Sequence, residues 1–383
     1  MPAVNTERTA ESRMRRFPIW RILFGLLMAA GLYATYLRIV GGLGAVTNLN
    51  DSFPWGIWIG FDILCGVGLA AGGFTLVAVV QIFNIQKYRP ILRPAILTAF
   101  LGYVLVILAL MFDLGRPDRI WHALIMWNPH SVMFEVAWCV MLYTTVLALE
   151  FSPVVFEKFG WEKPIRIVHA ISVPLIILGV ILSTLHQSSL GSLYLIVPTK
   201  LHALWYTPML PIFFFISAIT VGLAMTIFES YHSAKAFGKA LEWDLVNGLA
   251  RILAVALSVL LVFRFMDLAG RGVLHLAMEN TLEAWLFGLE VVLMLLPALL
   301  LYRSHVRRNV RAMYLCALMA VFGFIANRLN VSITGIEAGS GTSYIPKWTE
   351  VAVTLAIIAL GFAIFRLAAQ HLPVFAEHDA HGE

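Results

Sequence analysis

Several ionisable side chains stand within the apolar segments of this 383-residue chain. At ~1.5 Å of helical rise per residue, Glu135 lies about 6 Å and Asp62 about 10 Å inside one end of their segments. Further polar residues stand close to the same boundary: Arg38, Asp113, Arg116, His186 and Gln187. A charge that faces lipid is expensive, so such residues normally face a partner or a wet cavity. This polar layer therefore indicates a binding site.

The side chains of this layer have the chemistry that a quinone requires. A quinone needs hydrogen-bond donors for its carbonyl oxygens, and its reduction takes up two protons with two electrons. His186 can titrate near neutrality, and Asp62 or Glu135 could carry protons. Arg116 could stabilise an anionic quinone or keep a carboxylate ionised; alternatively, it pairs with Asp113 or Glu135 and only fastens helices. Aromatic and amide groups complete the layer: Trp55, Trp58, Asn128 and His130.

The chain carries two copies of one pattern, in which a small-residue triplet precedes an aspartate, an arginine and a glutamate. The copies are Gly68-Leu-Ala, Asp113-Leu-Gly-Arg116 and Glu135, and Gly222-Leu-Ala, Asp267-Leu-Ala-Gly-Arg271 and Glu290. Because the intervals within the copies match closely, we expect one duplicated membrane unit. The charges of the second copy could neutralise one another, which predicts a structural role or a charge relay: Arg264, Asp267, Arg271, Glu290 and Arg328.

Composition sets the class of protein. The chain is 60% hydrophobic and 13% charged, and its mean hydropathy is +0.84, which excludes a soluble domain. Runs long enough to cross a ~30 Å hydrocarbon core, roughly 20 helical residues, number about ten. They begin near Ile19, Trp55, Ala95, Ser131, Ile167, Pro208, Leu245, Leu282, Met313 and Val351. The predicted fold is an all-α polytopic membrane protein.

The repeat predicts how these helices are organised. Helices 2 to 5 and helices 6 to 9 should form two tandem, parallel four-helix bundles, with helices 1 and 10 at their flanks. The expected parts are an N-terminal segment at 1–18, the first helix and a loop at 19–54, the bundles at 55–207 and 208–335, a loop and the last helix at 336–372, and a tail at 373–383.

Most of the 27 Lys and Arg fall on the N-terminus, the even-numbered loops and the C-terminal flank. Cytoplasmic loops retain positive charge, so both termini should be cytoplasmic. The same bias explains the net charge of +5 without nucleic-acid binding. Basic residues used for this orientation include Arg13, Arg15, Arg16, Lys87, Arg89 and Lys239.

Histidine placement argues against a haem-carrying cytochrome. Only His169 and His186 fall clearly within expected spans, both on the fifth helix. They would stand roughly 25 Å apart along it, so they cannot ligate one iron. The three cysteines stand singly, without metal-ligand spacing or a partner for a disulfide. We therefore expect neither haem nor a metal in this chain.

Several longer motifs stand in series: LGAVTNLNDSFPWGIWIGFD at 43–62, GLAAGGF at 68–74, DLGRP at 113–117, SVMFE at 131–135, LALEFSPVVFEKFGW at 147–161 and HQSSLGSL at 186–193. Together they resemble the NrfD/polysulfide-reductase family of membrane subunits. The resemblance is greatest to its ten-helix branch, which includes the so-called cytochrome b subunit of periplasmic nickel-iron hydrogenases.

This resemblance implies a menaquinone or ubiquinone site near the outer face of the first bundle, in a bacterial inner membrane. It also implies a periplasmic ferredoxin-like iron-sulfur subunit as partner and, through it, a catalytic subunit, with a nickel-iron hydrogenase favoured over sulfite-reduction-associated or multihaem-cytochrome partners. The periplasmic loops at 41–54, 115–130 and 187–207 would dock that partner. The site carries over to Trp55, Asp62, Asp113, Arg116, Asn128, Ser131, Glu135, His186, Gln187 and Ser189.

Protons could cross the membrane if polar groups also line the inner half. Candidates for proton transfer are Asp62, Glu135, Glu150, Glu229 and Glu290, with Tyr103, Tyr143, Thr144, His169 and Ser172 as further steps. Two alternatives of other classes stay open. A secondary transporter also combines repeats with intramembrane charges, although no matched pair of Gly/Pro-broken helices stands at the midplane. The second alternative is a structural anchor for a peripheral redox complex.

Overall fold

The computed structural model describes residues 18–78, 80, 85, 88, 91–237 and 243–374. In these ranges ten helical segments are long and apolar enough to cross a membrane, and the pairing of extended backbone is limited to the isolated bridge Asn50–Phe53. The predicted all-α polytopic fold is confirmed. Most of the segments expected to be cytoplasmic at 1–18 and 373–383 lies outside the described residues, as do Arg13, Arg15, Arg16, Lys87, Arg89 and Lys239.

The spans are built from helices with the following bounds. They are α2 (Pro18–Gly41); η1 (Trp58–Ile63), α4 (Leu64–Leu69) and α5 (Gly72–Val77); α6 (Leu92–Asp113); α8 (Val132–Phe159); α10 (Ser172–Ser192) with η5 (Leu193–Ile196); α11 (Leu210–Phe237); α12 (Trp243–Gly270); α13 (Leu282–Tyr302); α15 (Val310–Leu329) with η7 (Asn330–Thr334) and α16 (Gly335–Ser340); and α17 (Trp348–His371). Short helices lie between them: α3 (Leu43–Val46), η4 (Pro117–Arg119), α7 (His122–Ile125), α9 (Glu162–Ala170), η6 (Leu274–Met278) and α14 (Ser304–Arg308).

Short polar side chains begin three of the spanning helices. Ser131, Thr281 and Asn309 are the N-caps of α8, α13 and α15, and each accepts hydrogen bonds from backbone N–H groups of the first turn. These caps satisfy donors that have no partner within the helix. At the other end of α8, Gly160 adopts a left-handed conformation with φ 68°, which ends the helix at low steric cost.

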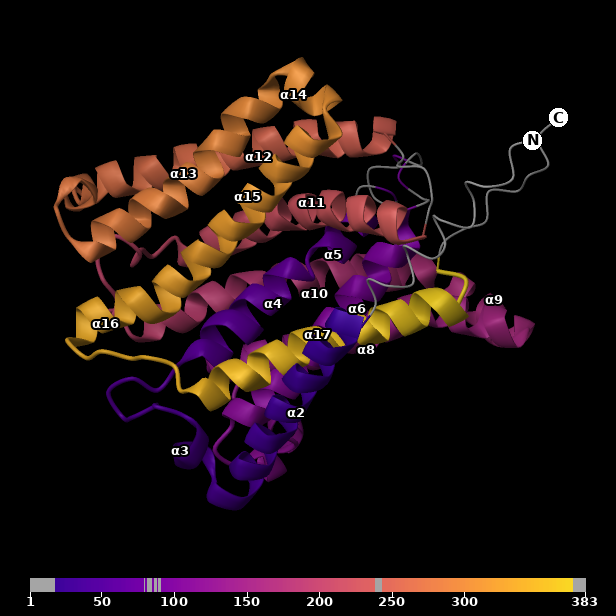
Figure 1. Cartoon of the computed structure of the whole chain (residues 1–383), viewed down its shortest axis with the longest axis horizontal. Helices are drawn as coiled ribbons and strands as arrows, with labels where there is room; N and C mark the ends of the chain where they lie inside the picture. Colours follow the sequence, from indigo (N-terminus) through magenta and orange to yellow (C-terminus); the bar gives the residue numbers. More distant parts are fainter. Residues whose placement is uncertain are drawn as a thin grey trace.

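The spanning helices are arranged as two adjoining groups of four (Figure 1). In the first unit the broken second span packs against α6, α6 against α8, α8 against α10, and α10 back against α4 and α5. In the second unit α11, α12, α13 and α15 pack in a ring of the same order. The yellow α17 runs beside α2 and along α6 of the first unit. We name the two ends of the molecule the α7 end and the α9 end, after the short helices that they carry.

The glycines of the two Gly-Leu-Ala triplets, Gly68 and Gly222, lie where the two units meet. A Cβ on Gly222 would stand 2.9 Å from the backbone carbonyl of Ala71, and a Cβ on Gly72 would stand 3.3 Å from the carbonyl oxygen of Gly222. Gly68 faces the ring of Phe324 on α15. Small residues allow such close approach of helices in lipid. The two units are therefore in backbone contact at their junction.

Two of the spans change to π-helix near the α7 end, and these π-helices pack against each other. They are η1 in the second span and η7 in the ninth. The hydroxyl of Ser332 of η7 lies against Gly60 of η1, where a Cβ would clash with it. π-Helical turns are rare and are often found at functional sites. The sequence pattern did not indicate these irregular segments.

The fifth span begins later than predicted, and this changes the position of one histidine. A break at Ile171 separates α9 from α10. Pro174 in the first turn of α10 explains the break, because it lacks an N–H and its ring would clash with the carbonyl of Ala170 in a continuous helix. His169 is therefore exposed on α9, and the prediction that it lies within a span is wrong.

Candidate functional site

His186 lies at the centre of the first unit, on α10, and is fully buried. Its Nδ1 shares a hydrogen bond of 2.8 Å with the hydroxyl of Tyr103 on α6. Its Nε2 is buried and has no hydrogen-bond partner among the described residues. If Tyr103 donates to Nδ1, Nε2 carries the proton and can donate; in the other tautomer Nε2 accepts. The neighbouring Gln187 donates through Nε2 to the carbonyl of Val67 at 3.2 Å.

Two aspartates of the site lie on facing segments near the α7 end. Asp62 of η1 is buried, and its Oδ2 accepts a hydrogen bond of 2.7 Å from Thr354 of α17. Asp113 is the last residue of α6, and its Oδ1 is buried without a partner among the described residues. The two carboxyl groups are near enough to interact electrostatically. Both carboxyl groups are therefore candidates for proton exchange near the α7 end.

A hydrogen bond between Glu135 and Ser189 joins α8 to α10, about one turn along α10 from His186. The Ser189 hydroxyl donates to Glu135 Oε1 at 2.5 Å. Glu135 lies in the first turn of α8, where the partial positive charge of a helix N-terminus favours a carboxylate. Ser131 is the N-cap of the same helix, with its hydroxyl 3.4 Å from the N–H of Phe134. By capping α8, Ser131 fixes the start of the helix whose first turn carries Glu135.

Trp55 lies where the chain enters the second span and is half-buried. Its indole meets the ring of Tyr194 edge-on, with 5.7 Å between the ring centroids. Tyr194 is fully buried and packs in turn against Phe214 of α11. The aromatic contact therefore connects the α7 end of the first unit with the second unit.

Two of the predicted residues lie away from this interior. Arg116 and Asn128 are exposed in the segment that links α6 to α8. Arg116 pairs with Asp118 at 3.0 Å, and not with Asp113 or Glu135 as the packing alternative required. The hydrogen bond from Arg116 holds the pKa of the exposed Asp118 below its usual value. Both side chains stand on the surface that the sequence predicts as a docking loop.

A line of polar groups leads from His186 toward the α9 end. Tyr143 packs edge-on against Tyr103, with 4.8 Å between the ring centroids. Glu150 lies two turns further along α8, and its Oε1 is buried without a hydrogen-bond partner among the described residues. A Cβ on Gly179 would stand 3.6 Å from Glu150 Oε1 and 3.9 Å from a ring carbon of Tyr143. The carboxyl and the phenol ring are therefore close neighbours.

Glu229 belongs to the second unit in sequence but contacts the first unit. It lies on α11 and accepts a hydrogen bond from the hydroxyl of Thr98 on α6. This bond places a second carboxyl near the α9 end of the first unit. The duplicated sequence assigned Glu229 to the second unit alone.

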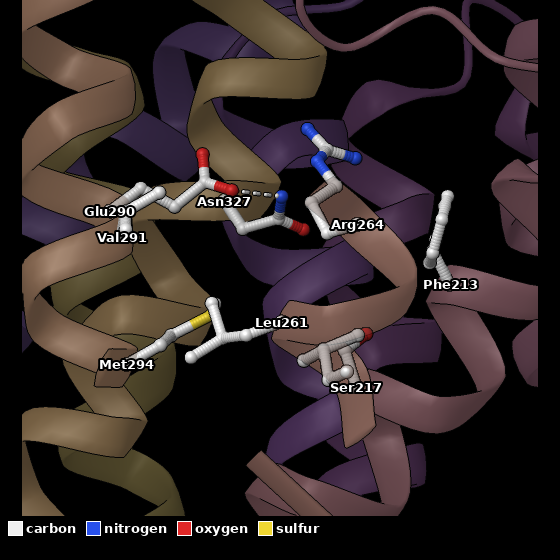
Figure 2. A pocket seen from close by; sticks show the side chains of 9 residues that line it. Phe213, Ser217, Leu261, Arg264, Glu290, Val291, Met294 and Asn327 are labelled. Carbon is white, nitrogen blue, oxygen red and sulfur yellow. Dashed lines mark hydrogen bonds between the residues drawn. The ribbon is translucent and has the colours of Figure 1, made fainter. Parts of the chain in front are cut away.

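The second unit holds Glu290 within a set of neutral donors, of which Figure 2 shows Asn327. Its Oε1 accepts from Asn327 Nδ2 at 2.7 Å. Its Oε2 accepts from Trp205 Nε1 at 3.1 Å and from Asn330 Nδ2 at 3.0 Å. Three such bonds satisfy a buried carboxylate well. Beside it lies a cavity of about 20 Å³, lined also by Arg264 and Ser217. That volume accommodates a water molecule, which needs roughly 10–15 Å³, and no quinone ring.

The arginines of the second unit make fewer ion pairs than the sequence suggested. Arg271 pairs with Asp267 at 2.8 Å. Arg328 is buried between Phe214 and Phe324, with its guanidinium carbon 3.6 Å and 4.4 Å from the ring centroids. Arg264 donates to the carbonyl of Leu204 at 3.2 Å. Arg328 also donates to Asn327 Oδ1 and Ser217 Oγ, both at 2.8 Å. Among the described residues, Arg264 and Arg328 are thus stabilised by aromatic rings and neutral oxygen acceptors.

The structure adds a group of residues at the start of α17 that the sequence reading missed. Glu350 is buried and accepts from Tyr344 at 2.5 Å and from the backbone N–H of Asn48 and Lys347 at 3.1 and 2.8 Å. Burial and the bond to Glu350 raise the pKa of Tyr344. A glutamate in the first turn of an apolar helix was the available signal, followed one turn later by Thr354.

The first unit thus combines a buried histidine whose Nε2 has no partner among the described residues, two neighbouring aspartates and a carboxyl close to a phenol. These groups can bind and protonate a carbonyl oxygen within the membrane. In the described part of the chain, no three His, Cys, Asp or Glu side chains are grouped as metal ligands.

Residues 45–338 match the family model described as polysulphide reductase, NrfD. The chain is 35% identical over 370 residues to the probable Ni/Fe-hydrogenase 2 b-type cytochrome subunit of Escherichia coli, covering 94% of each protein. It is 28% identical over 395 residues to the menaquinone reductase integral membrane subunit of Nitratidesulfovibrio vulgaris, covering 95% of this chain and 93% of that protein. It is also 26% identical over 373 residues to the Hdr-like menaquinol oxidoreductase integral membrane subunit of Archaeoglobus fulgidus, covering 90% of each.

These relatives are integral membrane subunits of hydrogenase and menaquinone oxidoreductase complexes. The family match covers more than half of the chain and includes every candidate residue of the first unit. The family expected from the motifs is confirmed: this protein belongs to the NrfD polysulphide reductase family of multi-pass membrane proteins.

Proposed function

We propose that this protein is the quinone-interacting membrane subunit of a respiratory redox complex. The observation that carries the proposal is His186, which is buried in the first unit with one nitrogen held by Tyr103 and the other without a partner among the described residues. Two relatives, the integral membrane subunits of a menaquinone reductase and of an Hdr-like menaquinol oxidoreductase, support the same substrate class. Reduction would convert the quinone, two electrons and two protons to the quinol.

In this proposal each residue has a defined task. His186 Nε2 would donate a hydrogen bond to a quinone carbonyl oxygen and hand over its proton as Tyr103 supplies another to Nδ1. Asp62 and Asp113 would provide the second proton at the α7 end. Glu135, held by Ser189, would bind at the border of the site, and Trp55 and Gln187 would line it. The electrons would come from a docked redox partner.

We place the α7 end at the periplasmic face of a bacterial inner membrane, with both termini cytoplasmic. The loops at this end would dock a ferredoxin-like iron-sulfur subunit, and through it a catalytic subunit. A nickel-iron hydrogenase is favoured because the Escherichia coli relative belongs to one. Arg116 and Asn128, which are exposed on this surface, would then contact the partner rather than the quinone.

The first test is direct binding. The chain in lipid nanodiscs is expected to bind about one molecule of a fluorescent hydroxyquinoline N-oxide, a quinone analogue, with competition by a short-tailed menaquinone. The measurement is fluorescence quenching on titration, with empty nanodiscs as the control. Saturable, competed binding supports the proposal. An absence of binding while the partner subunits remain attached in the native complex would favour a structural anchor instead.

We further propose that protons reach the quinone from the α9 end. Glu150, Tyr143, Tyr103 and His186 form a series of titratable or hydroxyl-bearing groups from that end to the site. A proton that travels along this series would cross part of the membrane before it joins the quinone, which would make the reaction electrogenic. Glu229, bonded to Thr98, offers a second entry near the same end.

A Glu150→Gln variant is expected to lose this proton supply, because an amide cannot release a proton. In proteoliposomes that hold the native complex, we expect quinone reduction to fall about 10-fold, and proton uptake from the α9 side to fall with it. The measurement uses pH-sensitive dyes on each side of the membrane. Glu157→Gln is the matched control, since Glu157 lies on the same helix but is exposed and pairs with Arg93. Uptake confined to the α7 side in the wild type would contradict this route.

A further inference from the structure

Helices α2 and α17 lie outside the stretch that matches the family model, which covers 45–338. They nevertheless pack against each other, and α17 also packs against α6 and η1 (Figure 1). These two helices are therefore in direct contact with the segments that carry Asp62 and Asp113. Their side chains could tune a site whose other parts belong to the shared core of the family.

Thr354 of α17 uses its hydroxyl to bond a carboxyl on another span, as Thr98 does with Glu229. Threonines in apolar helices commonly donate to the carbonyl one turn earlier, and Thr35, Thr75, Thr220 and Thr226 do so here. Thr354 instead donates across the helix interface to Asp62 Oδ2 at 2.7 Å, and both side chains are buried. The hydroxyl therefore acts on Asp62 rather than on its own helix.

The position of Thr354 is held by contacts one turn earlier on α17. The carbonyl of Glu350 accepts from Trp58 Nε1 of η1 at 3.1 Å. The Glu350 carboxyl accepts from Tyr344 and from backbone N–H groups of two loops. Thr349 also donates to the carbonyl of Val46. With α17 attached to η1 in this way, the distance between Thr354 and Asp62 has little freedom to change.

Arg38 of α2 acts on the other aspartate. It donates from Nε to the carbonyl of Phe112 at 2.9 Å and from Nη2 to that of Leu114 at 2.6 Å, so it caps the end of α6. Its charge also attracts Asp113, which ends that helix. The two carboxyl groups are thus flanked by α17 on one side and α2 on the other.

We propose that Thr354 is a positioning residue for Asp62 in quinone chemistry. Its hydroxyl occupies Oδ2 and fixes the rotamer of the carboxyl, which leaves Oδ1 to exchange a proton with the bound quinone. This inference rests on the proposed function. It adds a residue of α17 to the proposed site, and α17 lies outside the stretch that matches the family model.

The test compares Thr354→Val, which keeps shape but removes the hydroxyl, with Thr354→Ser, which keeps the hydroxyl. In the native complex Thr354→Val is expected to lower kcat for quinone reduction about 10-fold with KM changed less than about 2-fold, because the hydrogen bond orients a proton carrier rather than binding substrate. Thr354→Ser should restore kcat. Thr220→Val is the matched control, because it removes a hydroxyl that bonds only to its own helix.

A second readout does not need turnover. The infrared carboxyl band that disappears in Asp62→Asn should shift in Thr354→Val and keep its position in Thr354→Ser. An unchanged band, or a serine variant as impaired as the valine variant, would overturn the positioning role. If the wild-type chain binds no quinone analogue, the proposed function fails by itself; if it binds and turns over while Thr354→Val matches it in kcat, only the present inference fails.

Discussion

Replacing His186 by leucine is expected to lower quinone reduction by the native complex by about 100-fold or more, because a positioned acid–base group contributes 10²–10⁴ to rate. Leucine fills a similar volume, so the helices around it should keep their packing. The variant removes both the free Nε2 and the partner of Tyr103. The measurement is the initial rate of quinone reduction by purified complex, with subunit content determined in the same sample.

His169→Leu is the matched control for this change. His169 is exposed on α9, outside the spans, so its replacement should leave the rate unchanged. A His186→Gln variant, which keeps a hydrogen-bond donor but cannot relay a proton, should retain binding of the quinone analogue and lose turnover. Full turnover in His186→Leu, with all subunits present, would contradict a role for this histidine.

Replacing Glu290 by leucine is expected to lower the free energy of unfolding by about 3–5 kcal/mol, the cost of removing one member of a buried charged group. Three donors would lose their acceptor: Trp205, Asn327 and Asn330. The positive charge of the nearby Arg264 would also lose its compensation. The measurement is thermal unfolding of the detergent-solubilised protein, followed by the decay of helical circular dichroism.

The size of this effect should depend on whether an acceptor remains. Glu290→Gln keeps one carbonyl oxygen and should cost about 1–3 kcal/mol, the penalty of an unsatisfied buried group. Glu279→Leu changes an exposed glutamate of the preceding loop and should lie within about 0.5 kcal/mol of the wild type. A Glu290→Leu protein as stable as the wild type would show that the donors find other partners.

The sequence predicted the spans well because the bilayer imposes a length on every apolar helix. The spans predicted to begin at Ile19 and Leu282 begin there, and the others begin within a few residues of the predicted positions. The fifth span was the least accurate, because its hydrophobicity continues through Ile167 while Pro174 forces a new helix to start. Hydropathy does not register that backbone constraint.

Contacts between segments far apart in the chain could not be predicted from the sequence. Asp62 and Thr354 are 292 positions apart, and no local pattern indicates that they meet. Arg116 was predicted to belong to the quinone site or, alternatively, to pair with Asp113 or Glu135. The helix ends at Asp113, however, and the following turn carries Arg116 to the surface, where Asp118 is its nearest partner. Tertiary placement decided each of these cases.

The backbone contact between the two units bears on how the protein can work. Gly222 lies against the backbone of Ala71, and Gly60 lies against the side chain of Ser332, so the two bundles pack closely at two separate places. A carrier that alternates its access must rock one bundle against the other, and such a junction resists that motion. In the proposed function, protons and electrons would move through two bundles that keep their relative positions, and the distance from a docked redox partner to the quinone would then stay constant.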